Sequence, residues 1–276
     1  MDAAVPDGNG GAYVFWEDAR SGNYDVYGQH IRANGTPDPA WPAGGRAICA
    51  VAGDQTGISA LRTSSGHIWV VWNDRRDAVA KNYATLMTPT GVAEVGFPLS
   101  GIVIDASIPS AQSVPVATLD ETDNLLVVYE YAFTPTDRDV YGALVLINGT
   151  VPWKGALAGS GVNETSPTIT TTGDGLFTAV WVLGSGTVQV QRFSVFTGAP
   201  VGSSQAVSLT GTFAVQPRIA KDGWGGALLV WGESVGATTE PYWARFYNGV
   251  LTPHGTLATT GQLSLVMGDM IETGPH

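Results

Sequence analysis

Two acid–arginine pairs recur in this sequence at the same spacing. Asp18 is followed two residues later by Arg20, and Asp74 is followed in the same way by Arg76. Such a pair offers an acid and an anion-binding group for chemistry. Side chains two residues apart at a strand end also pair with each other and with the backbone amides of a turn. We expect this structural role for both pairs.

The polar loop between Asp18 and Asp25 is a weak candidate for a metal site. Its sequence, ARSGNY, would supply carbonyl oxygens beside the two carboxylates, and calcium prefers oxygen ligands. The spacing does not match an EF-type loop, and turns that hydrogen-bond their own backbone account for acids and asparagines in such loops. We therefore expect no cofactor, and structural calcium is the weaker alternative.

Acids that could cleave a glycosidic bond are present, but the sequence does not assemble them. Hydrolysis of this kind needs two carboxyl groups on either side of the bond. The four histidines also occupy unrelated positions, which indicates neither a metal cluster nor a Ser/His/Asp arrangement. The acids are Asp120, Glu121, Glu130, Glu164, Asp174, Asp222 and Glu233, and the histidines are His30, His67, His254 and His276.

Aromatic residues are the stronger binding candidates. Trp41, Phe97 and Trp153 follow one another at steps of 56 residues in Pro/Gly-rich segments, where loops are exposed by default. Exposed rings of this kind stack against sugars or peptides. The alternative is that the rings are packing wedges between neighbouring repeats. The predicted ligand-binding set adds the tyrosine of each of the first three repeats: Tyr27, Tyr83 and Tyr141.

Composition excludes several classes of partner. The chain has 276 residues, with 24 acids against 13 lysines and arginines, and its net charge is −11. No basic stripe is available to replace the counterions of a nucleic acid, so we expect none as a partner. No window approaches the roughly 20 apolar residues that span a bilayer, so we expect no membrane insertion. The single cysteine, Cys49, excludes an internal disulfide and is expected to be buried.

The elements that position these residues are repeats. A central aromatic recurs at steps of 56, 57, 52 and 50 residues, and a turn glycine recurs at steps of 56, 58, 49 and 51. The aromatic series and the glycine series therefore each predict five repeats. We expect one domain over residues 1–276, with repeats at about 1–54, 55–111, 112–163, 164–213 and 214–276. The aromatics are Trp16, Trp72, Tyr129, Trp181 and Trp231, and the glycines are Gly35, Gly91, Gly149, Gly198 and Gly249.

Each repeat contains four short strand-like segments separated by turns. Runs such as AYVFWED at 12–18 are too short for a helix and are bounded by glycine and acids, as buried strands are. We predict an all-β, five-bladed β-propeller with four antiparallel strands per blade and almost no helix. An open part of a six- or seven-bladed parent is the alternative. The buried inner-strand equivalents are expected to be Val14, Val71, Val128, Val180 and Val230.

The W-x-D-x-R…DVYG pattern resembles the propeller repeats of secreted bacterial proteins, distantly those of the TolB kind. It is seen at Trp16, Asp18, Arg20 and residues 25–28, again at Trp72, Asp74, Arg76 and Tyr83, and again at residues 137–141. The resemblance covers the first three repeats well and the last two only through Trp181 and Trp231. It implies the fold but not the function, because propellers support many functions.

These observations favour a non-catalytic, extracellular or cell-surface module that binds or scaffolds a glycan or a protein surface. Met1 stands directly before the first strand, so we interpret the chain as a trimmed domain of a secreted protein. The alternative is a glycoside hydrolase or lyase with carboxylates in the central cavity of the propeller.

Overall fold

The structure, a computed structural model, describes residues 2–98, 100–184, 186–208, 213–235, 238–252 and 255–257. Throughout these ranges every regular element is a β-strand, and no helix long and apolar enough to cross a membrane is found in them. The near-absence of helix predicted from the sequence is thus confirmed for this part of the chain. Contacts divide the chain into two compact units, residues 1–132 with 143–154 and residues 133–142 with 155–276.

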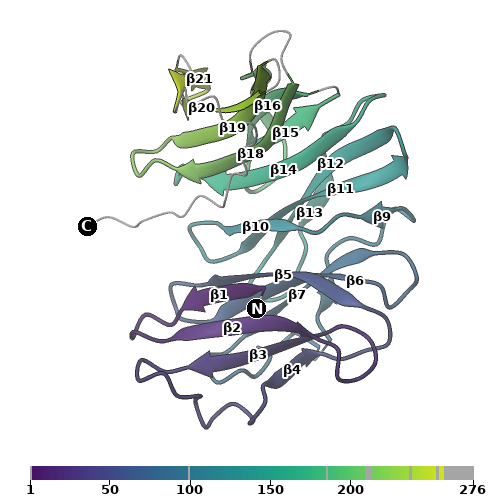
Figure 1. Ribbon diagram of the computed structural model, residues 1–276, viewed down its shortest axis with the longest axis vertical. Helices are drawn as coiled ribbons and strands as arrows, with labels where there is room; N and C mark the ends of the chain where they lie inside the picture. Colours follow the sequence, from purple (N-terminus) through teal and green to yellow (C-terminus); the bar gives the residue numbers. More distant parts are fainter. Residues whose placement is uncertain are drawn as a thin grey trace. The chain divides into compact units, whose positions relative to one another are not determined.

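Two four-stranded sheets lie in the first unit, and each takes its strands in chain order (Figure 1). We call them blades 1 and 2. Blade 1 consists of β1 (Ala3–Pro6), β2 (Ala12–Asp18), β3 (Asp25–Ile31) and β4 (Arg46–Cys49). Blade 2 consists of β5 (Gln55–Arg62), β6 (Ile68–Asp74), β7 (Lys81–Met87) and β8 (Ile102–Val103).

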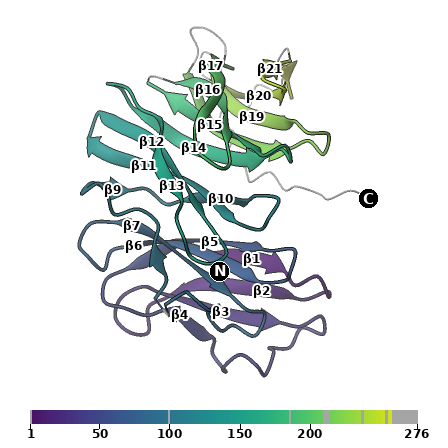
Figure 2. The ribbon, with the colours of Figure 1, turned by 180° about the vertical axis from the view of Figure 1, so that it is seen from behind.

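Three further sheets, blades 3 to 5, follow along the chain (Figure 2). Blade 3 consists of β10 (Val116–Leu119), β11 (Leu125–Thr134), β12 (Asp137–Val145) and β13 (Trp153–Ala158), with β9 (Ala111–Gln112) paired to β11. Blade 4 consists of β14 (Glu164–Thr171), β15 (Leu176–Leu183), β16 (Thr187–Ser194) and β17 (Pro200–Ala206). Blade 5 consists of β18 (Phe213–Lys221), β19 (Ala227–Val235), β20 (Thr238–Tyr247) and β21 (Val250–Leu251), with β22 (Gly255–Thr256) paired to β20.

Five consecutive antiparallel sheets of this order confirm the predicted fold class, an all-β five-bladed propeller with four strands per blade. Blades 3 and 5 each carry one additional short strand. The last strand predicted from the sequence, near residues 262–266, lies outside the described residues.

The hydrophobic cores form between neighbouring blades. Strand β6, with the sequence IWVVWND, is buried along its whole length, because β-branched and aromatic side chains fill both faces of an inner strand. One cluster joins Phe15 and Val26 of blade 1 to Trp72 of blade 2. Another joins Val180 and Val190 of blade 4 to strands of blade 5.

The first hairpin of every blade closes through the same turn, which we call the first-hairpin turn. Its first residue donates a backbone hydrogen bond to the carbonyl of its fifth residue, at 2.9 to 3.4 Å. Its fourth residue has a positive φ in all five blades, which explains the glycine at four of these positions and the aspartate Asp123 at the fifth. The turns are residues 7–11, 63–67, 120–124, 172–176 and 222–226.

The register corrects one of the predicted inner-strand equivalents. The residue before the marker aromatic pairs with the first strand of its blade as Ala3↔Phe15, Ser59↔Val71, Val116↔Val128, Thr168↔Val180 and Arg218↔Val230. Phe15, rather than Val14, is therefore the blade 1 equivalent. Phe15 is fully buried, whereas Val14 is half-buried, because a shift of one residue along a strand moves a side chain to the other face. Val230 is also only half-buried.

Candidate functional site

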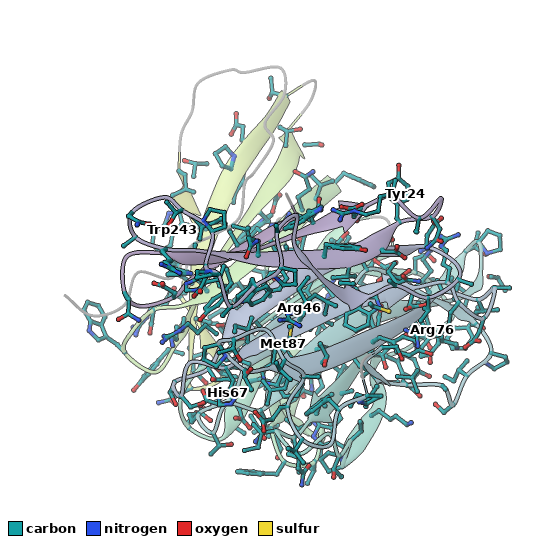
Figure 3. The ribbon with its side chains drawn as sticks, turned by 90° about the horizontal axis from the view of Figure 1, so that it is seen from below. Tyr24, Arg46, His67, Arg76, Met87 and Trp243 are labelled. Carbon is teal, nitrogen blue, oxygen red and sulfur yellow. The ribbon has the colours of Figure 1, made fainter. Side chains whose placement is uncertain are left out.

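The tryptophan, aspartate and arginine that recur in blades 1 and 2 form a hydrogen-bond network within their own blade. In blade 2, Nε1 of Trp72 donates a hydrogen bond to Oδ2 of Asp74 at 2.8 Å. Arg76 donates to the same carboxylate through its backbone N, Nε and Nη2, at 2.9, 3.0 and 2.6 Å. The guanidinium carbon of Arg76 lies 3.9 Å from the centre of the Tyr83 ring. Arg76 and His67 flank the two ends of β6 (Figure 3).

Blade 1 repeats this geometry. Trp16 donates to Asp18 at 2.9 Å, and Arg20 donates to it through its backbone N and Nε at 3.0 and 2.7 Å. Hydrogen bonds from Arg20 and Trp16 hold the pKa of Asp18 well below its usual range. Because both oxygens of each carboxylate accept from side chains of their own blade, the two pairs have the structural role expected from the sequence.

The weak calcium candidates, Asp18 and Asp25, are neighbours across the β2–β3 hairpin. Asp25 accepts hydrogen bonds from Oγ of Ser21 at 2.6 Å and from Nδ2 of Asn23 at 2.9 Å. These local bonds give Asp25 a structural role, as the Arg20 and Trp16 bonds do for Asp18, and the calcium alternative stays a prediction. Over the described ranges, no group of three or more His, Cys, Asp or Glu side chains is placed to hold a metal ion.

His30 lies between two carboxylates. Its Nε2 is 2.9 Å from Oδ2 of Asp7, and its Nδ1 is 2.9 Å from Oδ2 of Asp38. The hydrogen bond with His30 is the main cause that lowers the pKa of Asp7. This histidine therefore ties the first-hairpin turn of blade 1 to the loop after β3. His254 and His276 lie outside the described residues.

Two of the three loop aromatics predicted to bind a ligand are buried: Trp41 is 3% exposed and Phe97 is 8% exposed. Nε1 of Trp41 donates to the carbonyl of Pro89 at 3.2 Å, and a Cβ added at Gly91 would lie 2.8 Å from the Trp41 ring. Phe97 lies in the same way beside Gly149, 3.7 Å from such a Cβ. Each ring is thus wedged against a turn of the next blade, as the packing alternative expects. Their ligand-binding role stays a prediction.

The remaining candidates differ from one another. Trp153 is half-buried and begins β13, so it does not lie in the predicted loop. An arginine lies over the ring of Tyr27, which is half-buried, and another over that of Tyr83, which is 8% exposed. Tyr141 is half-buried in β12 and shares its strand face with two acids.

These acids are Asp137 and Asp139. They are two residues apart in β12, so their side chains point to the same side. Glu164, the first residue of β14, is 1% exposed and lies close enough to the Asp139 carboxyl group to raise its pKa. We call Asp137, Asp139 and Glu164 the acidic cluster; all three belong to the second unit.

The acidic cluster has too few hydrogen-bond donors. Oδ1 of Asp137, Oδ1 of Asp139 and Oε2 of Glu164 are buried and have no hydrogen-bond partner among the described residues. Ser160 Oγ donates to the other oxygen of Glu164 at 2.5 Å. A buried acceptor without a donor costs about 1–3 kcal/mol. A proton, or a donor group on a ligand, would satisfy these oxygens.

The same position holds an amide in blades 2 and 3, and in blade 5 it holds Ala214. By its register, Glu164 corresponds to Gln55 at the start of β5 and to Gln112 in β9. Gln55 donates through Nε2 to the carbonyl of Gly53 at 2.7 Å, and Gln112 accepts from the backbone N of Asn82 at 2.6 Å. An amide both donates and accepts, whereas an ionised carboxylate only accepts. The fold therefore does not need a carboxylate at this position.

Burial raises the pKa of Asp139 above its ordinary value, and the negative charges of Glu164 and Asp137 raise it further. An acid with a raised pKa beside a second carboxyl group is how proteins hold a proton for general-acid chemistry. Two residues along a strand span about 6.6 Å. This backbone spacing is of the same order as the separation of the two carboxyl groups in inverting glycosidases, about 6.5–9.5 Å.

Sequence reasoning named Glu164 among the candidate acids but found no partner for it. Asp139 was assigned only to the repeated DVYG pattern, and Asp137 only to the repeat resemblance. The signal that would have found the cluster is the exchange of glutamine for glutamate at position 164 within an aligned repeat, directly next to an acid of the preceding blade.

A Glu164→Gln variant is expected to be more stable than the unchanged protein, and this difference in the free energy of unfolding should grow as the pH rises. A raised folded-state pKa of Asp139 means that its contribution to stability is complete at acidic pH and is lost as the pH rises through that pKa. Replacing one of two buried like-charged groups by the amide of blades 2 and 3 should stabilise the protein by about 1–2 kcal/mol at pH 8 and by much less at pH 4. Urea unfolding at the two pH values measures this difference.

The control is Glu121→Gln, because Glu121 is an exposed turn carboxylate. Its free energy of unfolding should be unchanged at either pH. A loss of stability in Glu164→Gln at pH 8 would show instead that the Glu164 carboxylate has hydrogen-bond donors in the folded protein.

No family model and no curated protein matches the sequence, so a TolB-like family assignment has no such support. Solved structures share the fold. A protein of unknown function from Dyadobacter fermentans has a TM-score of 0.56 at 12% identity, covering 94% of this chain and 83% of its own. A polysaccharide lyase, an ulvan lyase, has a TM-score of 0.56 at 10% identity, with 90% and 69% covered.

A thermostable family-43 glycoside hydrolase has a TM-score of 0.49 at 8% identity, covering 98% of this chain and 95% of its own. The expectation of a non-catalytic protein is corrected by the ulvan lyase. The propeller fold on which it rested is shared with a polysaccharide lyase, which points to an enzyme fold. The physical reason for the error is that residues repeated in every blade are those that pack the core. Catalytic carboxylates occur at single positions, so a search for repeats does not find them.

Proposed function

We propose that this protein is a carbohydrate-active enzyme that hydrolyses a glycan, with Asp139 as the proton donor. The observation that carries the proposal is the acidic cluster, in which buried carboxyl oxygens lack donors at a place where blades 2 and 3 take an amide. The similarity in fold to a polysaccharide lyase supports it.

In this proposal each member of the cluster has one role. Asp139, whose pKa is raised by burial and by the neighbouring acids, gives its proton to the glycosidic oxygen as the bond to the sugar breaks. Asp137 acts from the same strand face, as the base that activates water or as the nucleophile. Glu164 touches neither sugar nor water; it is a positioning residue that keeps the proton on Asp139.

Hydrolysis of an uncharged glycan fits the charges better than cleavage of a polyanion. The chain has a net charge of −11, and the acidic cluster would repel a substrate carboxylate or sulfate. We therefore propose a neutral polysaccharide as the substrate class and an extracellular or cell-surface setting, where such polymers occur.

An Asp139→Asn variant tests the proposal. The protein is incubated with arabinan, galactan, xyloglucan and hydroxyethyl cellulose, and with polygalacturonate as a polyanionic comparison. Reducing ends report hydrolysis, and ultraviolet absorbance of an unsaturated product reports lyase chemistry. We expect hydrolysis of at least one neutral polymer and a loss of at least about a hundredfold in kcat in Asp139→Asn.

Glu164→Gln should keep part of the activity while moving the basic limb of its pH profile to lower pH, because the pKa of Asp139 falls. The control Glu121→Gln should match the unchanged protein. An Asp139→Asn variant with full activity, or unsaturated products released from polygalacturonate alone, would overturn the proposal.

A further inference from the structure

Trp224 is the most exposed tryptophan among the described residues, with 81% of its surface accessible. It occupies the third position of the first-hairpin turn of blade 5, which is the sequence Asp222-Gly-Trp-Gly-Gly226. Large aromatic side chains are ordinarily buried, because burying one gains about 1.5–3 kcal/mol. A tryptophan left in solvent therefore calls for an explanation at this site.

Comparison with the other blades shows that the turn itself does not require an aromatic residue. All five turns share the same backbone hydrogen bond and the same positive φ at the fourth position. In the other four blades the third position holds a small polar residue, and several of these hydrogen-bond within the turn. The residues at this position are Asn9, Ser65, Thr122, Asp174 and Trp224.

The turn that carries Trp224 is held firmly by polar contacts. Oδ1 of Asp222 accepts hydrogen bonds from the backbone N of Trp224 at 2.7 Å and of Gly226 at 2.9 Å. Its other oxygen, Oδ2, accepts from Nε of Arg245 in the neighbouring strand β20 at 2.5 Å. The guanidinium carbon of Arg245 lies 4.9 Å from the centre of the Tyr247 ring, and Tyr247 is 41% exposed. The ion pair thus ties the turn that carries Trp224 to a strand with a second accessible ring, Tyr247.

We propose that Trp224 is a sugar-stacking site that binds one unit of a neutral polysaccharide. A flat ring with hydrogen-bonding groups beside it suits a pyranose, whose C–H face packs on the indole while its hydroxyls reach polar groups. Arg245, whose side chain is 32% exposed, supplies hydrogen-bond donors from the neighbouring strand. The carboxylate beside the ring and the net charge of −11 disfavour a nucleic acid. A protein partner needs about 800 Å² per side, far more than one ring in a glycine turn offers.

This site goes beyond the proposed hydrolysis, because Trp224 belongs to no part of the acidic cluster and takes no part in proton transfer. It holds polymer without cleaving it, so its test is a measurement of binding. Weak stacking at one unit gains strength on a polymer that offers many units.

The experiment is affinity electrophoresis and calorimetry of Trp224→Asn with the same five polysaccharides, on the Asp139→Asn background so that no polymer is cleaved. Asparagine is the residue that blade 1 carries at this position, so the turn should be kept, and thermal unfolding checks this. We expect Kd for at least one neutral polymer to rise about tenfold or more in Trp224→Asn. Trp224→Phe should recover part of the affinity.

Val95→Asn is the control, because Val95 is an 89% exposed residue of blade 2 whose side chain is apolar but not aromatic. Its affinity should equal that of the background protein. Equal affinity of Trp224→Asn and the background would overturn the inference while leaving the proposed hydrolysis intact. Absence of binding to every neutral polymer would overturn it as well, and in that case hydrolysis is still judged by the reducing-end assay.

Discussion

An Asp74→Ala variant is expected to lose about 3–5 kcal/mol of its free energy of unfolding, because it leaves a partly buried guanidinium without its carboxylate. Asp74 is 1% exposed and accepts hydrogen bonds from Trp72 and from three nitrogens of Arg76. Removing the carboxylate leaves both the indole N–H of Trp72 and the guanidinium of Arg76 without their hydrogen-bond acceptor. Urea unfolding followed by tryptophan fluorescence measures the loss.

The matched variant is Asp18→Ala in blade 1. It breaks the same contacts, but the side chain of Arg20 is 50% exposed and that of Asp18 is 12% exposed, so water replaces much of what is lost. We expect a cost of about 0.5–1.5 kcal/mol there. Equal losses in the two variants would show that burial does not decide the strength of this repeated network.

A Trp41→Ala variant is expected to lose about 3–5 kcal/mol of stability, the range for deleting a buried aromatic side chain. Trp41 is 3% exposed, its ring lies against Gly91 of blade 2, and its Nε1 donates to Pro89. The deletion opens a cavity between the two blades and leaves the Pro89 carbonyl without its donor. Calorimetric unfolding measures the effect.

Trp41→Phe separates packing from hydrogen bonding, because it keeps most of the ring and removes only the N–H. Its expected cost is about 1–2 kcal/mol. If Trp41→Ala were as stable as the unchanged protein but bound polysaccharide more weakly, the wedge assignment would be wrong and the ligand-binding prediction for Trp41 right.

The sequence by itself determined the five blades and their class. Marker aromatics such as Trp16 and Trp72, and the turns between strands, repeat at near-constant spacing because each blade is the same local unit of hairpins. Hairpin turns and strand alternation depend on neighbours along the chain, and a single sequence records them. The closed Trp–Asp–Arg networks were also predictable, since all three residues lie within five positions.

Only the tertiary structure decided which side chains meet across blades. Trp41 stands in a loop, and its burial depends on a turn of blade 2 some 50 residues further on. Asp139 and Glu164 come from different blades, and the raised pKa of Asp139 follows from burial and from the nearby Glu164, which no local pattern encodes. The choice of Val14 instead of Phe15 has another origin, because Phe15 directly precedes Trp16 just as Val71 directly precedes Trp72, so the sequence itself held this register. Long-range contacts fixed the candidate site, while local repetition fixed the fold.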